Sequence, residues 1–97
     1  MKIQKTETFK KWLDKLKDRV AKARILDRIK RLQEGNFGEV KGITNGQGVK
    51  EMILDFGPGY RIYYKEIKVT VVLLLVGGTK RTQDRDIKKA KELARQF

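Results

Sequence analysis

The chain has no histidine and no cysteine, and it has a single proline among its 97 residues. The absence of cysteine excludes disulfides and thiolate chemistry, which fits a cytoplasmic protein. The absence of histidine removes the side chain that most often moves protons at neutral pH. Any catalysis by this chain would therefore depend on charge stabilisation by its cations and on pKa values that those cations shift.

Long apolar runs are also missing. The longest, VVLLLV at residues 71–76, is far shorter than the roughly 20 residues that cross a bilayer. The first ten residues, MKIQKTETFK, lack the apolar stretch of a secretory signal. We expect a soluble, unexported protein without a membrane partner. The sequence also has no phosphate-loop motif and no cluster of metal-ligating residues, so we expect neither a cofactor nor a metal.

Positive charge is abundant. Lys and Arg number 24 against 12 Asp and Glu, which gives a net charge of +12 and a pI of about 10.1. Residues 1–34 carry +7 (12 basic, 5 acidic) and residues 79–97 carry +4 (7 basic, 3 acidic), whereas the middle of the chain carries only +1. This balance points to a polyanionic partner, with nucleic acid or an anionic surface as the first candidates.

Two amphipathic helices are predicted in the first third of the chain. Thr6 or Thr8 is expected to cap the first, and Asp18 caps a second that Gly35 ends. In the first helix, apolar residues recur at i, i+3, i+4 and i+7: Phe9, Trp12, Leu13 and Leu16. In the second they share one face: Val20, Ala21, Ile25, Ile29 and Leu32. The two helices form a predicted hairpin, and Ile3 ahead of it fits a short leading strand.

The pattern then changes to strands separated by glycine-rich corners, at residues 39–42, 49–56, 60–66 and 68–76. Pro58 and Gly59 suit the central positions of a type II turn. A terminal helix after Thr82, its predicted cap, follows from the spacing of Ile87, Ala90, Ala94 and Phe97. The predicted fold is one α+β domain over residues 1–97, with the helical hairpin packed on a small antiparallel sheet.

Strand alternation assigns side chains to the two faces of this sheet. Glu51, Arg61 and Tyr63 fall on the face away from the helical hairpin. The short terminal helix is expected to cover this face only in part. The result is a predicted open groove, with Arg61 and Tyr63 on its floor and Lys80 and Arg81 at its rim.

Three segments resemble a known family: GNFGEVKGI, GVKEMILDFGPGYRIYY and VVLLLVGGTKRTQDRDIKKAKEL. They are similar to the HigB-like branch of the RelE/ParE toxin superfamily, and with the FKKWLDKLKD and ARILDRIKRL helices the similarity covers nearly the whole chain. The order GPGYR, then GGxKxTQxxDI, is its specific part. The resemblance implies a RelE-like fold and a cytoplasmic toxin of a type II toxin–antitoxin system.

The resemblance further implies a metal-independent, ribosome-dependent mRNA endoribonuclease that inhibits translation. The partners would be mRNA, the ribosome and a cognate antitoxin, expected to be a helix-turn-helix protein in a hetero-oligomer with the toxin. In such cleavage the 2′-hydroxyl attacks the adjacent phosphate. The enzyme has to help deprotonate that hydroxyl, stabilise a dianionic phosphorane and protonate the leaving 5′-oxygen.

Six residues are candidates for this chemistry by the resemblance. Arg61 matches the arginine that holds the scissile phosphate, and Lys80 and Arg81 match the basic pair after the last strand. Glu51 and Tyr63 are candidates for base, acid or base-stacking platform. The sixth, an acidic residue at the start of the last helix, is Asp86.

Other interpretations stay open for several of these residues. Asp86 also suits a helix-dipole partner, and Arg61 also suits an ion pair with Glu51 or Asp55 across the hairpin. Ile53 stands where family members often carry a cation. The alternative functions are a non-catalytic toxin of the ParE type, which inhibits DNA gyrase, and a basic RNA-binding module.

The charge balance predicts salt-sensitive binding to RNA. Neutralising on the order of 6 phosphates should weaken binding roughly a thousandfold between 50 and 200 mM salt, because counterions released from the RNA oppose the complex more strongly as salt rises. Fluorescence anisotropy with a labelled single-stranded RNA measures this slope. Affinity that stays flat across the range would contradict a nucleic-acid partner.

Overall fold

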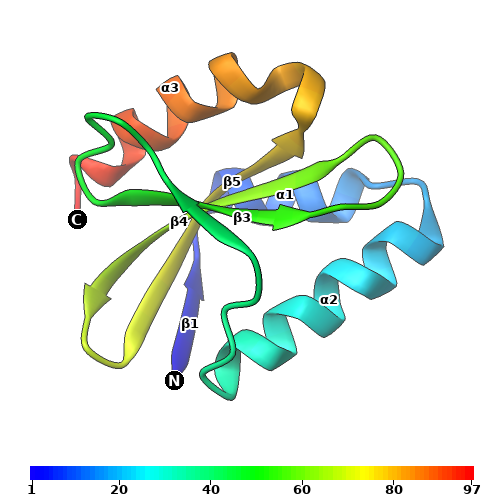
Figure 1. Ribbon diagram of the computed structural model, residues 1–97, viewed down its shortest axis with the longest axis horizontal. Coiled ribbons are helices and arrows are strands. Elements are labelled where there is room, and N and C mark those ends of the chain that lie inside the picture. Colours follow the sequence, from blue (N-terminus) through cyan, green and yellow to red (C-terminus); the bar gives the residue numbers. More distant parts are fainter.

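A five-stranded sheet separates two helical layers in the computed structural model, which describes residues 1–97 (Figure 1). The elements in chain order are β1 (Lys2–Lys5), α1 (Glu7–Lys15), α2 (Arg19–Gln33), β2 (Val40–Gly42), β3 (Val49–Leu54), β4 (Tyr60–Lys68), β5 (Val71–Thr79), a 3₁₀ turn (Lys80–Thr82) and α3 (Gln83–Ala94). Helices α1 and α2 lie on one side of the sheet and α3 lies on the other (Figure 1). The protein therefore has the predicted α+β class. None of its helices is both long and apolar enough to pass through a membrane.

The sheet is mixed, so the prediction of an antiparallel sheet is wrong. Its strand order is β1-β5-β4-β3-β2, and every neighbouring pair is antiparallel except β1 and β5, which are parallel. The strand expected at Ile3 is confirmed, and Ile3 pairs with Val72. The fold thus begins with a strand and not with the helical hairpin. Because β1 pairs with residues about 70 positions away, local pattern alone does not give its direction.

The helical hairpin forms as its capping residues predict. Thr6 accepts a hydrogen bond from the Phe9 amide (3.0 Å), and Asp18 accepts from the amides of the first turn of α2. Gly35, at φ +89°, lies just past the end of α2. Val20 is 65% exposed, so its predicted place on the buried face of α2 is wrong. The core between the hairpin and the sheet includes Phe9, Leu13, Ile25, Ile29, Met52, Ile62, Tyr64 and Leu74.

Several boundaries differ from the predicted ones. Strand β4 runs on to Lys68, and the chain turns at Val69, which is 94% exposed. Strand β3 ends at Leu54, and the following turn is centred on Gly57 and Pro58, because the Gly59 amide donates to the Phe56 carbonyl at 3.0 Å. The predicted Pro58–Gly59 centre is therefore wrong, although Gly59 does have a positive φ of 78°.

Strand β5 carries a register shift that reverses its alternation. Tyr63 on β4 pairs with Val76, and Tyr64 pairs with Leu74, so Leu75 is left over. Leu75 and Val76 consequently both pack with the core on the α3 side. Such a bulge adds one residue to a strand and changes the face of every residue after it.

The shift places the two glycines that follow on opposite faces of the sheet. A Cβ on Gly77 would lie 2.1 Å from the Trp12 ring, so only glycine lets α1 pack this close to β5. A Cβ on Gly78 would collide with the Asp86 carboxylate of α3. The double glycine therefore sets how closely a helix approaches β5 from each side.

Replacing Gly77 with alanine should destabilise the fold. The added methyl group would collide with Trp12, and overpacking of this kind costs about 1–3 kcal/mol. Gly42→Ala is the matched control, because a Cβ there meets nothing within 4 Å; its effect should stay within about 0.5 kcal/mol. Urea denaturation followed by circular dichroism measures both variants. Equal stabilities for the two would show that α1 does not depend on this close approach.

Candidate functional site

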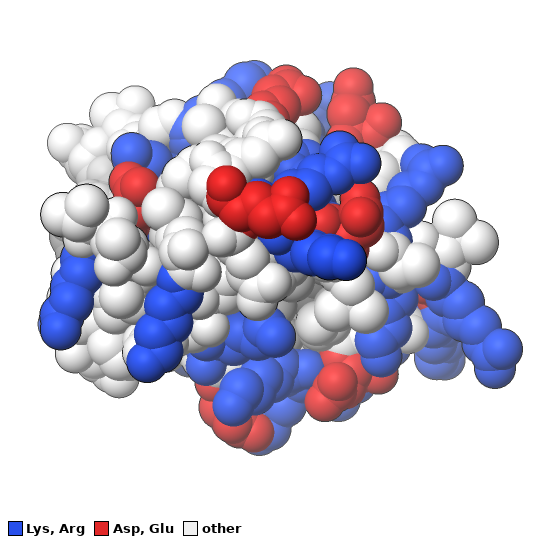
Figure 2. All heavy atoms as spheres, turned by 90° about the horizontal axis from the view of Figure 1, so that it is seen from below, with Lys and Arg blue, Asp and Glu red and all other residues white.

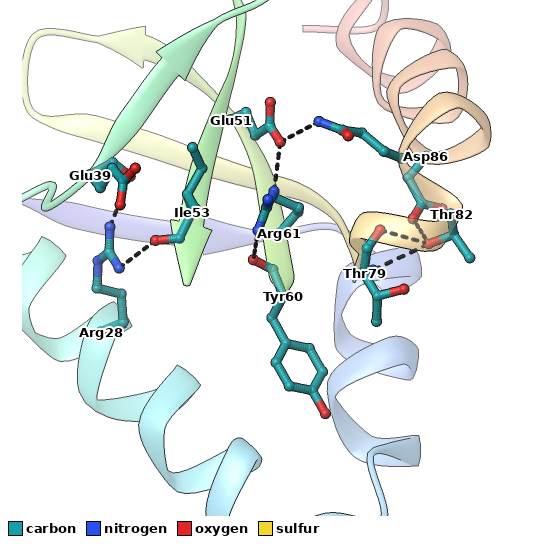
Figure 3. A network of polar contacts seen from close by, with 10 residues as sticks. Arg28, Glu39, Glu51, Ile53, Tyr60, Arg61, Thr79, Thr82 and Asp86 are labelled. Atoms are coloured by element: carbon teal, nitrogen blue, oxygen red, sulfur yellow. Dashed lines mark hydrogen bonds and ion pairs between the residues drawn. The ribbon is translucent and has the colours of Figure 1, made fainter. Parts of the chain in front are cut away.

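Arg61 lies on the α3 side of the sheet, in register between Ile53 and Gly78 on the neighbouring strands. Its Nε lies 2.9 Å from Glu51 Oε1, and its Nη1 donates to the Tyr60 carbonyl at 3.0 Å. The two side chains point toward each other in Figure 3. Only 11% of the Arg61 side chain and 6% of that of Glu51 is exposed. The predicted ion pair with Glu51 is therefore present.

Gln83, the first residue of α3, is the third member of this cluster. Its Nε2 donates to Glu51 Oε1 at 2.6 Å, so the same carboxylate oxygen faces both the guanidinium and the amide. No role was predicted for Gln83, although it lies inside the GGTKRTQ segment. A polar residue at the first position of a helix is ordinarily read as a solvated residue. Its contact with Glu51, 32 positions earlier, depends on how α3 crosses the sheet.

Lys80 and Arg81 lie in the 3₁₀ turn that joins β5 to α3, and both are exposed. Gly59 connects this turn with Arg61. Its carbonyl accepts from the Lys80 amide at 2.8 Å, and a methyl group on Gly59 would lie 3.4 Å from Lys80 Cβ and 3.5 Å from Arg61 Nη1. The fold therefore brings Arg61 and Lys80 together. Neither Lys80 nor Arg81 forms an ion pair.

Asp86 is buried beneath the first turn of α3, where its carboxylate lies against Gly78. The Thr82 hydroxyl donates to Asp86 Oδ2 and accepts from the Thr79 amide at 3.2 Å. This side-chain network, drawn in Figure 3, ties the 3₁₀ turn to α3. Thr82 is the N-cap residue of α3, as predicted, but its hydroxyl bonds Asp86 and no amide of the helix. The position of Asp86 fits a structural role.

Tyr63 is completely buried, which corrects the predicted groove. Ala90 and Ala94 of α3 belong to the same core cluster as this tyrosine, and their small side chains let the helix lie close to the sheet. A base-stacking platform at Tyr63 is therefore wrong for this conformation. The surface is hollowed in two other places, one beside β1 and the end of α3, the other along α2.

Burial raises the pKa of Tyr63 well above its ordinary value, and the nearby carboxylates of Glu51 and Asp86 raise it further; Arg61 acts in the opposite direction. The phenol is therefore neutral at physiological pH, which excludes it as a ready-made base. Its hydroxyl has no hydrogen-bond partner, and Arg61 Nε, although close to Glu51, makes no well-directed hydrogen bond. Of these two buried donors, only the Tyr63 hydroxyl is without any acceptor; Arg61 Nε faces the Glu51 carboxylate at 2.9 Å.

The nearby Arg28 is a cation of a different kind. It projects from α2 and donates to the carbonyls of Ile53 (2.9 Å), Phe37 (3.1 Å) and Glu39 (3.0 Å). Figure 3 shows the contacts with Ile53 and Glu39. Burial lowers its pKa. Three backbone carbonyls occupy its guanidinium, so Arg28 fixes the segment before β2 against the end of β3. It is a structural residue, although it lies on a helix rich in exposed cations.

Comparison with known proteins connects the chain to a protein of Haemophilus influenzae. That protein is described as uncharacterized and is 51% identical to this chain over 97 residues. The alignment covers 100% of this chain and 96% of the Haemophilus protein. The two proteins belong to one family. No protein-family description matches the chain, and no solved structure matches it.

The arrangement can bind an anion at one end of the sheet. A guanidinium has five N–H donors, and Arg61 gives one hydrogen bond to Tyr60 and faces Glu51 with its Nε. Exposed Lys80 and Arg81 add two further positive charges from the adjoining turn. Glu51 is the carboxylate closest at hand for proton transfer. The chain has no group of three or more metal-ligating side chains that could hold an ion.

Replacing Tyr63 with phenylalanine should leave stability at pH 7 unchanged or raise it by up to about 1 kcal/mol, because the lost hydroxyl is buried without a partner. The difference in favour of the variant should grow at high pH. The pKa of Tyr63 is higher in the folded chain than in the unfolded chain, where it is about 10. Below pH 10 both states keep the proton. Above pH 10 the unfolded state loses it first, so the parent loses stability as pH rises.

The Tyr63→Phe variant should therefore lose stability less steeply than the parent above pH 10. Urea denaturation at pH 7, 10 and 11 measures this slope. Tyr64→Phe is a useful comparison, since burial also raises the pKa of Tyr64, to about 12, and the same flattening is expected there. A loss of more than about 1 kcal/mol at pH 7 for Tyr63→Phe would show that its hydroxyl has a hydrogen-bond partner after all.

Proposed function

We propose that the chain is a HigB-like member of the RelE/ParE superfamily, with a RelE-like fold, and that it acts as a type II toxin that cleaves mRNA on the ribosome. The main support for the proposal is that Arg61 and Lys80 both lie next to Gly59. These two cations come from the GPGYR and GGxKxTQ segments that carry the resemblance. Their proximity is what a shared phosphate site requires.

In this proposal the scissile phosphate binds Arg61, with Lys80 and Arg81 adding positive charge around it. The cations stabilise the dianionic phosphorane that forms when the 2′-hydroxyl attacks. A phosphate on Arg61 lies next to Glu51, whose carboxylate is 2.9 Å from the guanidinium and accepts the hydroxyl proton. The products are a 2′,3′-cyclic phosphate and a free 5′-hydroxyl, whose proton comes from a neighbouring cation or from water.

The buried Tyr63 hydroxyl gives the proposal a second support. It lacks an acceptor, and an unsatisfied buried donor costs about 1–3 kcal/mol. Arg61 Nε faces Glu51 at 2.9 Å without a well-directed hydrogen bond. A phosphate oxygen is an acceptor that suits both groups. Binding of RNA would then require α3 to yield at its first turn, where Gln83 holds Glu51. A cognate antitoxin would hold the toxin inactive in the cytoplasm.

A non-catalytic toxin of the ParE type is the second candidate, and a specific observation favours it. The Arg61 side chain is only 11% exposed, and Ile53, opposite it on β3, supplies no cation. A surface that acts only by binding does not need an accessible arginine at this point. Gyrase inhibition would therefore be expected to survive loss of Arg61.

The decisive variants are Arg61→Ala and Lys80→Ala. Expressed in bacteria, the parent should arrest growth and cleave cellular mRNA, and each variant should reduce the cleavage rate by about 100-fold or more, since single charge-stabilising groups are worth this much. Lys88→Ala, which removes an exposed cation from α3, is the matched control and should retain cleavage. Primer extension maps the cuts, and thermal melting confirms that each variant is folded.

Three outcomes would contradict the nuclease proposal. Cleavage that is unchanged in both site variants would refute the site. Intact mRNA together with inhibited DNA supercoiling would select the gyrase-inhibiting toxin. Normal growth on expression would leave only the basic RNA-binding module, whose RNA affinity the salt titration measures.

A further inference from the structure

A groove of about 660 Å³ runs along the outer side of α2, on the opposite side of the sheet from Arg61. Its floor is apolar and is formed by Val20, Ala23, Leu54 and Phe56. Val20 is 65% exposed although it lies on the helix that packs against the core. An exposed aliphatic residue beside an aromatic one, rimmed by charge, is typical of a surface that a partner covers.

The groove follows one side of α2 along the helix axis, because its lining residues there recur at helical spacing. Its lining residues on α2 extend from Arg19 to Arg31, which at 1.5 Å per residue is about 18 Å. The neighbouring strand offers no free backbone edge, because the Ile53 amide donates to Glu39 and its carbonyl accepts from Arg28. An extended peptide therefore cannot add to the sheet here. A helix, whose own backbone is satisfied, fits an apolar groove of this kind.

The charge of the rim is positive. Four arginines and two aspartates line the groove. Arg31 is paired with Asp27 at 3.1 Å, whereas Arg19 and Arg24 have no carboxylate partner. The Arg24 guanidinium lies 4.8 Å from the centre of the Phe56 ring, so the cation is held at the groove without being neutralised. Two arginines are thus free to pair with acids on a partner.

We propose that this groove binds an acidic amphipathic helix of a partner protein. Aliphatic side chains on one face of that helix would cover Val20 and Phe56, and its glutamates would pair with Arg19 and Arg24. This surface is separate from the proposed phosphate site, so its partner does not depend on the nuclease activity.

RNA fits the groove less well. Asp27 and Asp55 line it and would repel a phosphate backbone. The one aromatic ring, Phe56, is already covered by Arg24 and is not open for base stacking. On the face drawn in Figure 2, cations are spread over the surface with acids between them. The apolar floor is what distinguishes the groove from that general positive charge.

The probe for the test is a fluorescein-labelled synthetic peptide of about 16 residues, matched to the length of the groove. It carries leucines at i, i+3, i+4 and i+7 spacing and otherwise glutamates and alanines. A second peptide of the same composition has its leucines scattered around the helix. Anisotropy titrations with the intact protein should give micromolar binding of the first peptide and binding at least about ten-fold weaker for the second.

Two variant pairs localise the binding. Val20→Glu and Arg24→Glu should each weaken it about ten-fold or more, since each removes a central contact. Their controls are Leu26→Glu and Lys30→Glu, which change exposed residues of α2 outside the groove and should leave affinity nearly unchanged. Arg61→Ala should bind as the parent does, which separates this result from any failure of the nuclease proposal.

The proposal is overturned by any of three results. Equal weakening by the groove variants and their controls would show that general charge attracts the peptide. Absence of binding at 100 μM peptide would show that the groove has no affinity for such helices. A single-stranded RNA that competes with the peptide, and whose own binding falls in Val20→Glu and Arg24→Glu, would assign the groove to RNA.

Discussion

The rest of this structure depends on two glycines of β5, Gly77 and Gly78, because their lack of side chains lets a helix pack closely on each side of the strand. Gly77 receives the Trp12 ring from the hairpin side, and Gly78 receives the Asp86 carboxylate from the α3 side. The first contact fixes α1 against the centre of the sheet. The second fixes the first turn of α3, and with it the position of Gln83 above Glu51. A side chain at either glycine would move a helix away, and the cluster around Arg61 would lose one of its walls.

The Arg61–Glu51 pair is costly to bury, and its partial satisfaction bears on function. Taking two charges out of water costs several kcal/mol per ion unless their remaining hydrogen bonds are made. Glu51 has a second donor in Gln83, but Arg61 Nε makes no well-directed hydrogen bond and the Tyr63 hydroxyl beneath α3 has none. A residue needed only for stability would be better replaced by a packed apolar side chain. In the proposed function, an incoming phosphate would replace Glu51 as the partner of Arg61, and the incomplete hydrogen bonding of this pair is consistent with such an exchange.

Local patterns in the sequence are sufficient for much of this fold, because capping residues and side-chain periodicity act over a few positions. Asp18 and Thr6 cap helices where they are expected, and strand alternation correctly places Arg61, Glu51 and Tyr63 on one face. The larger failures are non-local, whereas local ones shift a turn by one residue or misplace single side chains such as Val20. The parallel direction of β1 depends on its pairing with β5, and the register shift at Leu75 is hidden in a uniformly apolar run. The burial of Tyr63 depends on how closely α3 packs, which follows from two alanines on a helix more than 25 positions away.

The sequence does not show which arginines are structural and which are free to bind a ligand. Their contacts in the structure distinguish them. Arg28 donates to three backbone carbonyls and is held as a structural cross-link. Arg61 has one carbonyl and one carboxylate, and Arg24 has only the Phe56 ring. A guanidinium whose N–H groups already donate to fixed backbone acceptors has few donors free for a ligand. One with free N–H groups can still bind a carboxylate or phosphate through two parallel hydrogen bonds. The two proposed anion sites, for a phosphate beside Arg61 and for a carboxylate beside Arg24, therefore differ chemically and lie on opposite sides of the sheet.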